Sequence, residues 1–379
     1  MLNQDSVFLA IVFWIFVSTL VIQLFYYLWF YLALPLFRQE SAVSPPSFPG
    51  PVSVIICARN EAENLEKFLP MVLEQKYPDY EVIVVNDCSE DNSYEVLGKF
   101  LLKYPHLKVS TINKDPKFTH NKKLAQFIGI KASKNELLLF TDADCRPDSD
   151  RWIELMVRHF NEKTTFVLGY GGYLRKKGLL NSFIRYDCMT IAMQYFGMAI
   201  RGIPYMGVGR NLAYRRSLFF ANKGYGPHNQ LASGDDDLLV NGNATRENTR
   251  TEFDPGAHTR SVPALTAAEF IKQKRRHYTT APHYLLKHKL LLATEPASRL
   301  IFYASFIILL SCLFLWPYIL IAFGLRLIVQ IITLISVSRK LKEPGIVPVS
   351  LFFDILSPLF YSILYISKPG KRQARTRWK

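Results

Sequence analysis

The stretch LLLFTDAD, residues 137–144, sets apolar side chains directly before the carboxylates of Asp142 and Asp144. A continuous apolar run is typical of a β-strand that is covered on both faces, and this run ends where the acids begin. Two neighbouring carboxylates repel each other, and a divalent cation removes that conflict. Mg²⁺ and Mn²⁺ prefer oxygen ligands of this kind. The stretch therefore predicts a metal-binding strand end, with a simple turn as the competing interpretation.

The residues that precede this stretch predict an α/β fold. Strand and helix patterns alternate along the chain, which indicates parallel β-α-β units. The expected strands are residues 52–57, 81–86, 107–112 and 137–141, and the expected helices are residues 61–75, 91–103 and 122–131. In a sheet of this type, ligands bind at the carboxyl ends of the strands.

Polar and acidic residues follow three of the expected strands. Ala58 and Glu61 lie just after the first strand, Asp87 follows the second, and Asp142 and Asp144 follow the fourth. Nucleotide binding is a natural interpretation of such an edge. The chain has neither G-x-G-x-x-G nor G-x-x-x-x-G-K-[ST], which argues against a dinucleotide-dependent oxidoreductase and a P-loop enzyme.

Two charged segments lie further along the chain. Asp235, Asp236 and Asp237 come directly before an apolar segment, where acids stabilise a helix N-terminus or supply a general base. Residues 272–278, KQKRRHY, form a cationic cluster on an expected helix, for which a solvated or lipid-facing surface is the alternative interpretation. Neither segment decides a function when it is taken alone.

Both ends of the chain are strongly apolar. Residues 6–37 contain no charged side chain, and roughly 20 apolar residues are enough to span a bilayer. No Lys or Arg precedes this run, so a membrane anchor is expected and a cleaved signal peptide is not. Residues 300–316 and 318–337, divided by Pro317, predict two more membrane helices.

The last apolar stretch, residues 346–367, leaves two topologies open. Residues 339–342 and the tail 368–379 are both basic, and basic segments stay in the cytoplasm. If both are cytoplasmic, residues 346–367 do not cross the membrane; if they cross, one basic segment lies on the other side. Arg326 and Asp354 lie in apolar surroundings, where charges are costly, and mutual pairing would explain both.

The order of the charged motifs resembles the membrane-bound family 2 glycosyltransferases, which include synthases of hyaluronan, cellulose and chitin type and many bacterial relatives. Four motifs follow one another as in that family: Asp87, Asp142-x-Asp144, Gly234-Asp235-Asp236 and Gln273-x-x-Arg276. The resemblance covers the central domain and the anchor–domain–anchor layout. It implies a GT-A fold, in which an α/β nucleotide-binding half is joined to an acceptor half. The family motif continues with Trp where this chain has His277.

The resemblance also implies residue roles. It implies that the nucleotide contacts Ala58, Glu61, Asp87, Lys122 and Asp142, although Asn121 replaces the glycine that precedes the family's lysine. It implies that Asp144, with Asp142, binds Mg²⁺ or Mn²⁺. Asp236 resembles the general base, with Asp235 beside it. The remaining resemblances imply contacts with the diphosphate or the acceptor from Gln273, Arg276, Gly209 and Asn211.

The implied chemistry agrees with elementary physical arguments. A metal and Arg276 would stabilise the charge that grows on a leaving diphosphate. A carboxylate on the opposite side of the sugar would take the acceptor proton, so a single displacement would invert the anomeric centre. We expect a nucleotide-diphosphate donor, a UDP-sugar first, and a polysaccharide or lipid-linked sugar as acceptor. The alternatives are a catalytically silent membrane scaffold of this fold and transfer to a polyprenyl phosphate.

The expected organisation divides the chain into five regions. They are an anchor at 1–40, a GT-A domain at 50–265, a Gln-x-x-Arg element with interfacial helices at 266–298, a membrane region at 299–367 and a basic cytoplasmic tail at 368–379. One of the interfacial helices is expected at 283–292. We expect a bacterial inner-membrane protein with a cytoplasmic catalytic domain. The 46 Lys and Arg against 31 Asp and Glu suit a membrane surface and anionic substrates, and no motif indicates nucleic acid.

Overall fold

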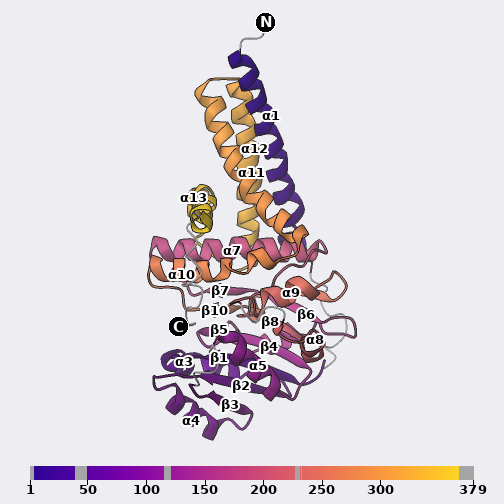
Figure 1. The fold of residues 1–379 in the computed structure, drawn as a ribbon, viewed down its shortest axis with the longest axis vertical. Helices are drawn as coiled ribbons and strands as arrows, with labels where there is room; N and C mark the ends of the chain where they lie inside the picture. The colour runs from indigo at the N-terminus through magenta and orange to yellow at the C-terminus, as the bar shows by residue number, and fades with distance from the viewer. Residues whose placement is uncertain (1–3, 39–48, 115–120, 227–230, 232, 367–379) are drawn as a thin grey trace.

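The computed structural model describes residues 4–38, 49–114, 121–226, 231 and 233–366. Figure 1 shows a helical bundle that contains the N-terminal helix and stands above an α/β domain. Two further helices, α7 (Leu179–Ile200) and α10 (Ala267–Tyr278), lie between the bundle and the sheets. The molecule therefore has a layer of helices at the junction of its two parts.

The α/β domain is built on a sheet of seven strands in the order β3-β2-β1-β4-β8-β6-β9. Four of them run parallel: β1 (Val52–Ala58), β2 (Tyr80–Asp87), β3 (Leu107–Ile112) and β4 (Leu137–Asp142). Each agrees with the predicted strand to within one residue at either end. The parallel register brings the carboxyl ends of β1, β2 and β4 to one edge, as the sequence pattern required.

Helices cover both faces of this parallel sheet. Three pack on the face that carries Val54 and Ile56: α3 (Ala62–Leu73), α4 (Ser93–Lys103) and α6 (Trp152–Val157). On the other face lies α5 (Lys122–Ala132), which approaches β1 and β2 closely at Gly129. A Cβ at Gly129 would lie 2.7 Å from Cγ2 of Ile55, so the glycine sets how near the helix can come.

The second half of the domain extends the same sheet with antiparallel pairing. β8 (Leu212–Arg215) runs antiparallel to β4 and to β6 (Phe166–Gly169), and β9 (Thr249–Glu252) completes the sheet. A smaller sheet contains β5 (Cys145–Pro147), β10 (Thr259–Ser261) and β7 (Gly171–Tyr173). Two short helices complete this half: α8 (Arg216–Ala221) and α9 (Asp237–Asn243). The strand direction thus reverses directly beside Asp142.

The helix α7 was not predicted because its apolar residues surround the whole helix. A helix that is hydrophobic all round is buried in the interior and shows no amphipathic period. At Gly197 it contacts the backbone of Phe30, which lies in the π-helical segment Tyr26–Tyr31. This contact joins the α/β domain to the foot of the bundle.

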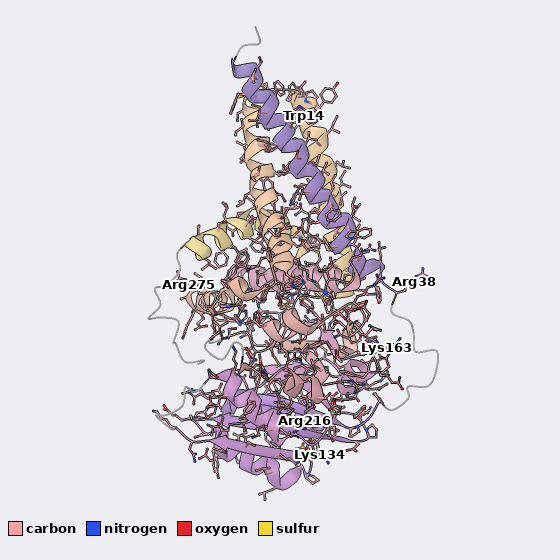
Figure 2. All side chains as sticks on the ribbon, turned by 45° about the vertical axis from the view of Figure 1, so that its right-hand side comes forward. Trp14, Arg38, Lys134, Lys163, Arg216 and Arg275 are labelled. Carbon is pink, nitrogen blue, oxygen red and sulfur yellow. The ribbon has the colours of Figure 1, made fainter. Side chains whose placement is uncertain are left out.

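The bundle contains α1 (Gln4–Phe25), which continues through the π-helical segment into α2 (Ala33–Leu36), together with α11 (Leu286–Ser311) and α12 (Trp316–Lys340). Among the described residues, four helices are long and apolar enough to cross a membrane, these three and α13 (Val347–Ile366). Stacked aromatic rings fill the core of the bundle, and Trp14 points outward, as Figure 2 shows. An apolar exterior is what a bilayer requires.

The start of α11 corrects the sequence prediction. Residues 281–283 form a 3₁₀ turn, so the helix expected at 283–292 begins at Leu286 and continues without a break into the predicted membrane helix. The charged residues Lys287, Lys289 and Arg299 lower the hydropathy of this segment but do not interrupt its helix. The membrane helix predicted at 300–316 is therefore the second half of a longer one.

The helix α13 bears on the two open topologies. Figure 1 shows it end-on, across the foot of the bundle, whereas α1, α11 and α12 run upright. The loop before it is fixed to the α/β domain by Glu343, which is buried and accepts a hydrogen bond from Nε of Arg185 at 2.8 Å. Residues 339–342 therefore lie on the side of the α/β domain, and the predicted pair forms, since Arg326 lies 2.9 Å from Asp354.

Candidate active site

A cavity of about 880 Å³ lies between the carboxyl edge of the sheet and the helices above it. Seven of the site residues predicted from the sequence line it: Lys122, Asp142, Gly209, Asp235, Asp236, Gln273 and Arg276. They come from segments far apart in the chain, namely α5, β4, the loops before β8 and α9, and α10. The fold therefore collects most of the predicted residues around one space.

An ion pair forms the floor of this cavity. Asn121 caps α5 by accepting a hydrogen bond from the backbone of Leu124 at 2.9 Å, which places Lys122 in the first turn. The Nζ of Lys122 lies 2.6 Å from Oδ1 of Asp142. Burial alone would raise the pKa of Asp142, but the Lys122 charge outweighs it and holds that pKa below its ordinary value. Asp142 is thus an ionised carboxylate at neutral pH.

Asp236 lies in the opposite electrostatic condition. Burial, and then the charge of Asp235, raises the pKa of Asp236 well above its ordinary value. Its carboxylate packs against the backbone of Gly209, where any Cβ would overlap it, and accepts a hydrogen bond from Gln126 at 3.3 Å. A carboxylate with a raised pKa is a stronger base, which suits proton abstraction near neutral pH.

The two neighbouring acids differ from Asp236 in their contacts. Asp235 is almost fully buried and lies 3.9 Å from the Nζ of Lys122. Asp237 begins α9 and accepts hydrogen bonds from Thr280 at 2.6 Å and Tyr284 at 2.7 Å. Asp237 therefore ties α9 to the segment after α10, whereas Asp236 has its carboxylate at the cavity.

One group of potential metal ligands lies at the end of β4. The ligand atoms of Asp142, Asp144 and Cys145 are all within 4.8 Å of one another. Burial, and then the charge of Asp144, raises the pKa of the Cys145 thiol, which also contacts Oγ of Ser261 at 2.8 Å. A protonated thiol is a poor ligand, so the two carboxylates favour a hard cation.

The helix α10 brings cationic and polar groups over the cavity. It begins with a capping box between Thr266 and Glu269. Gln273 donates a hydrogen bond to the hydroxyl of Tyr173 at 3.2 Å, and Arg276 lines the cavity one turn later. His277, which stands where the family motif has Trp, is exposed on this helix.

Five predicted site residues do not line the cavity: Ala58, Glu61, Asp87, Asp144 and Asn211. The first four lie at or just after the ends of β1, β2 and β4, beside the cavity floor. Asn211 is different, because it is fully buried under the sheet edge. It accepts a hydrogen bond from Nε1 of Trp152 at 3.0 Å and donates to the carbonyl oxygens of Tyr170 and Ala257 at 2.9 and 2.7 Å.

Two further parts of the wall lie outside the set of predicted site residues. Arg210 lines the cavity with its guanidinium 4.3 Å from the ring centre of Tyr173, and its Nη1 has no hydrogen-bond partner among the described residues. The signal for Arg210 was its place beside Gly209. The second part comes from α11 and α13, where the only sequence signal was Asp354 within an apolar segment.

The comparisons with known proteins support one family. Residues 53–219 match the profile of the family described as Glycosyl transferase family 2. The glycosyltransferase AglE of Haloferax volcanii is 38% identical over 105 residues, which is 27% of this chain and 33% of AglE. The probable glycosyltransferase YdaM of Bacillus subtilis is 29% identical over 255 residues, which is 64% of this chain and 55% of YdaM. The matches thus span from a third to about half of these relatives.

A solved structure extends the likeness to the fold. The mannosyltransferase PcManGT from Pyrobaculum calidifontis, in complex with GDP-Man and Mn²⁺, superimposes with a TM-score of 0.55 at 16% sequence identity. The superposition covers 87% of this chain and 99% of PcManGT. The mixed sheet and its layer of helices are therefore those of a GT-A glycosyltransferase, as predicted. The chain carries a glycosyl transferase family 2 domain of GT-A fold, combined with apolar helices that are long enough to cross a membrane.

Proposed function

We propose that this protein is a membrane-bound glycosyltransferase, which moves a sugar from a nucleoside-diphosphate donor to a hydroxyl group of a polysaccharide or lipid-linked acceptor. The observation that carries the proposal is the charge arrangement of one cavity. An ionised acid, Asp142, and a carboxylate of raised pKa, Asp236, line the same space as the guanidinium groups of Arg210 and Arg276. This arrangement suits a diphosphate leaving group and an attacking hydroxyl.

The residues divide the reaction between them. Asp236 takes the proton of the acceptor hydroxyl as its oxygen attacks the anomeric carbon, and the high pKa of this carboxylate favours the transfer. Arg276 and Arg210 stabilise the negative charge that develops on the leaving diphosphate. Asp142, Lys122, Asp87, Glu61 and Ala58 form the nucleotide side of the site, and Gln273 and Gly209 line the acceptor side. A single displacement of this kind inverts the anomeric centre, and a UDP-sugar is the first donor to test.

Asp144 and Asp142 would hold a divalent cation, Mg²⁺ or Mn²⁺. Their carboxylate oxygens fit a hard cation, and the solved structure of PcManGT contains Mn²⁺ together with its nucleotide-sugar. When bound, the cation neutralises charge on the donor diphosphate. Lys122 contacts Oδ1 of Asp142 and keeps that carboxylate ionised, as cation binding requires.

We further propose that the α/β domain lies in the cytoplasm, in a bacterial inner membrane. The basic residues 339–342, at the end of α12 and just after it, lie on the side of this domain, which agrees with the tendency of basic segments to stay inside. In Figure 2, Arg38 and Arg275 lie at the level where the bundle meets the domain. The proposed regions remain 1–40, 50–265, 266–298, 299–367 and 368–379, of which the last lies outside the described residues.

Two alternative functions can be separated from this proposal by experiment. A catalytically silent scaffold would have no need of Asp142, Asp144 and Asp236, all of which are present. Transfer of the sugar to a polyprenyl phosphate would use the same donor site with a different acceptor group. Both are distinguished by the products that the purified protein forms.

The first experiment is donor hydrolysis by the full chain in detergent. UDP-, GDP- and dTDP-sugars are incubated with Mn²⁺ or Mg²⁺, and the released nucleotide is measured. We expect release from one donor, its loss with EDTA, and its loss in Asp144→Ala. The matched control is Asp150→Ala, which removes an exposed carboxylate of the same segment that pairs with Lys76 at the surface. Release that ignores EDTA and survives Asp144→Ala would contradict the metal site.

A further inference from the structure

The cavity continues past the catalytic acids to the level of the membrane helices. Its far wall is formed by residues of α11 and α13: Ala293, Ala297, Arg299, Ser357, Pro358 and Tyr361. Ala293 and Ala297, on the α11 side of this wall, are exposed and line the cavity. The cavity is therefore open to the outside between these two helices, at the foot of the bundle.

The wall at this opening is polar, and hydrogen bonds between α11 and α13 hold it in place. Pro358 has no backbone N–H, so the carbonyl oxygen of Asp354, one turn earlier, lacks its helical partner. Arg299 of α11 donates to that carbonyl at 3.3 Å and to the Asp354 carboxylate at 2.9 Å. A freed carbonyl in a membrane helix is tolerated where side chains satisfy it in this way. The two helices are thus held together beside an opening and do not close it.

The opposite face of α13 is apolar. Phe352, Ile355, Leu359 and Ile363 are exposed, whereas Ser357 and Tyr361 face the cavity. A helix that lies across the foot of the bundle with such a division of faces is suited to the membrane interface. The opening between α11 and α13 therefore meets the bilayer at the depth where lipid headgroups and acyl chains join.

The bundle above the cavity is filled. Along α11, the residues that line the cavity end at Leu300. Beyond it, the ring of Phe302 stacks on Phe16 at 5.0 Å, and Phe306 stacks on Phe323 at 4.3 Å. These aromatic contacts fill the described part of the bundle beyond the end of the cavity. An acceptor that uses this cavity enters and leaves at the membrane surface.

We propose that the membrane-facing end of the cavity binds the acceptor, and that this acceptor is a membrane lipid with a hydroxyl-bearing headgroup. The headgroup reaches Asp236, and the apolar chain passes out between α11 and α13 into the bilayer. The headgroup oxygen forms a bond to the anomeric carbon, the bond from that carbon to the diphosphate oxygen breaks, and the proton goes to Asp236. This inference rests on the proposed function and narrows its acceptor to the lipid-linked class.

The test blocks the opening without touching the donor site. The full chain is reconstituted in vesicles made from the lipid extract of its source membranes and is given the labelled donor found by the hydrolysis screen. Ala297→Trp fills the opening, and Ala304→Trp is its matched control, because Ala304 is exposed on the same helix but does not line the cavity. Released nucleotide, label in the chloroform–methanol phase and label in water-soluble products are measured together.

We expect label in the lipid phase, a fall of more than about tenfold in Ala297→Trp with unchanged nucleotide affinity, and no change in Ala304→Trp. Should Ala297→Trp fail to fold, Ser362→Trp on the facing side of the opening replaces it. Equal transfer by Ala297→Trp and Ala304→Trp would overturn the inference, as would label that enters only water-soluble chains. Nucleotide release without labelled lipid defeats this inference alone, whereas no release from any donor defeats the proposed function and the inference with it.

Discussion

Two buried clusters of charge lie at opposite ends of the cavity, and they differ in balance. At the sheet edge, the carboxylates of Asp142, Asp235 and Asp236 lie around Lys122, whose ammonium group is within 4 Å of Asp142 and Asp235. At the foot of the bundle, two carboxylates and two guanidinium groups pair with one another: Glu295, Asp354, Arg299 and Arg326. The first cluster is unbalanced around Asp236, which has no ion-pair partner within 4 Å among the described residues, whereas in the second cluster every charge has such a partner.

The difference separates a binding site from a structural one. Burying an ion is unfavourable unless partners compensate it, so a neutral, mutually paired cluster is stable as it stands. An excess of buried carboxylates raises the pKa of at least one of them, as in Asp236, and is relieved by a cation or by a proton from a substrate. Charge imbalance therefore marks the proposed catalytic end of the cavity.

The largest expected effect follows from the loss of Asp236. Asp236→Asn keeps the shape of the side chain but removes the base, so transfer should fall by about 10³-fold. Donor affinity and the thermal midpoint should stay close to those of the unchanged protein. The measurement is the initial rate of transfer beside a nucleotide-binding titration. Full activity in a folded Asp236→Asn protein would show that the acceptor proton goes elsewhere.

Substitutions in the balanced cluster at the foot of the bundle should change the stability of the protein. Arg326→Met leaves Asp354 with one cation fewer and should destabilise the protein by about 3 kcal/mol, whereas catalysis per folded molecule should not change. The double variant with Asp354→Asn should lose less than the two single changes together, because the charge imbalance is gone. Thermal midpoints in detergent test this cycle. Additive losses would mean that the pair does not act as a unit.

The sheet and the acids at its edge were predictable from the sequence, and the membrane-facing half of the cavity was not. Strands β1 to β4 can be predicted from their own residues, because a parallel strand that is buried on both faces consists of a short run of Val, Ile and Leu. The helices α7, α11 and α13 meet only through contacts between residues far apart in the chain, such as Arg299 with Asp354. No local sequence pattern indicates which charged residues pair with each other in the folded protein.

Asn211 shows the same limit within the α/β domain. The family resemblance assigns it to the acceptor side, but its three hydrogen bonds are all made inside the protein. We expect Asn211→Ala to destabilise the fold by about 2 kcal/mol, since it leaves buried polar partners unpaired. The Michaelis constants of the remaining folded protein should not change. A rise in the acceptor Michaelis constant without loss of stability would restore the binding role.

The smallest expected effect is a displacement of the pH profile. Asp236 is active only when ionised, so the transfer rate should rise with pH through the pKa of this group, which burial and Asp235 place above the ordinary value of about 4 for aspartate. Lys122 acts in the opposite direction and lowers that pKa. Lys122→Met should therefore move the rising limb of kcat/KM to higher pH, in addition to weakening the donor site.

The matched control for this change is Lys131→Met, an exposed lysine near the end of the same helix, which should leave the limb in place. If Lys122→Met left the limb where it was while Asp236→Asn abolished it, Lys122 would not act on the base. Removing a positive charge raises the pKa of a neighbouring carboxylate and of a neighbouring cation alike, so a limb that moved to lower pH would contradict any direct action of Lys122 on the base, and the loss of the limb in Asp236→Asn identifies the titrating group. The direction of the displacement, read together with Asp236→Asn, therefore tests whether the unbalanced cluster supplies the base.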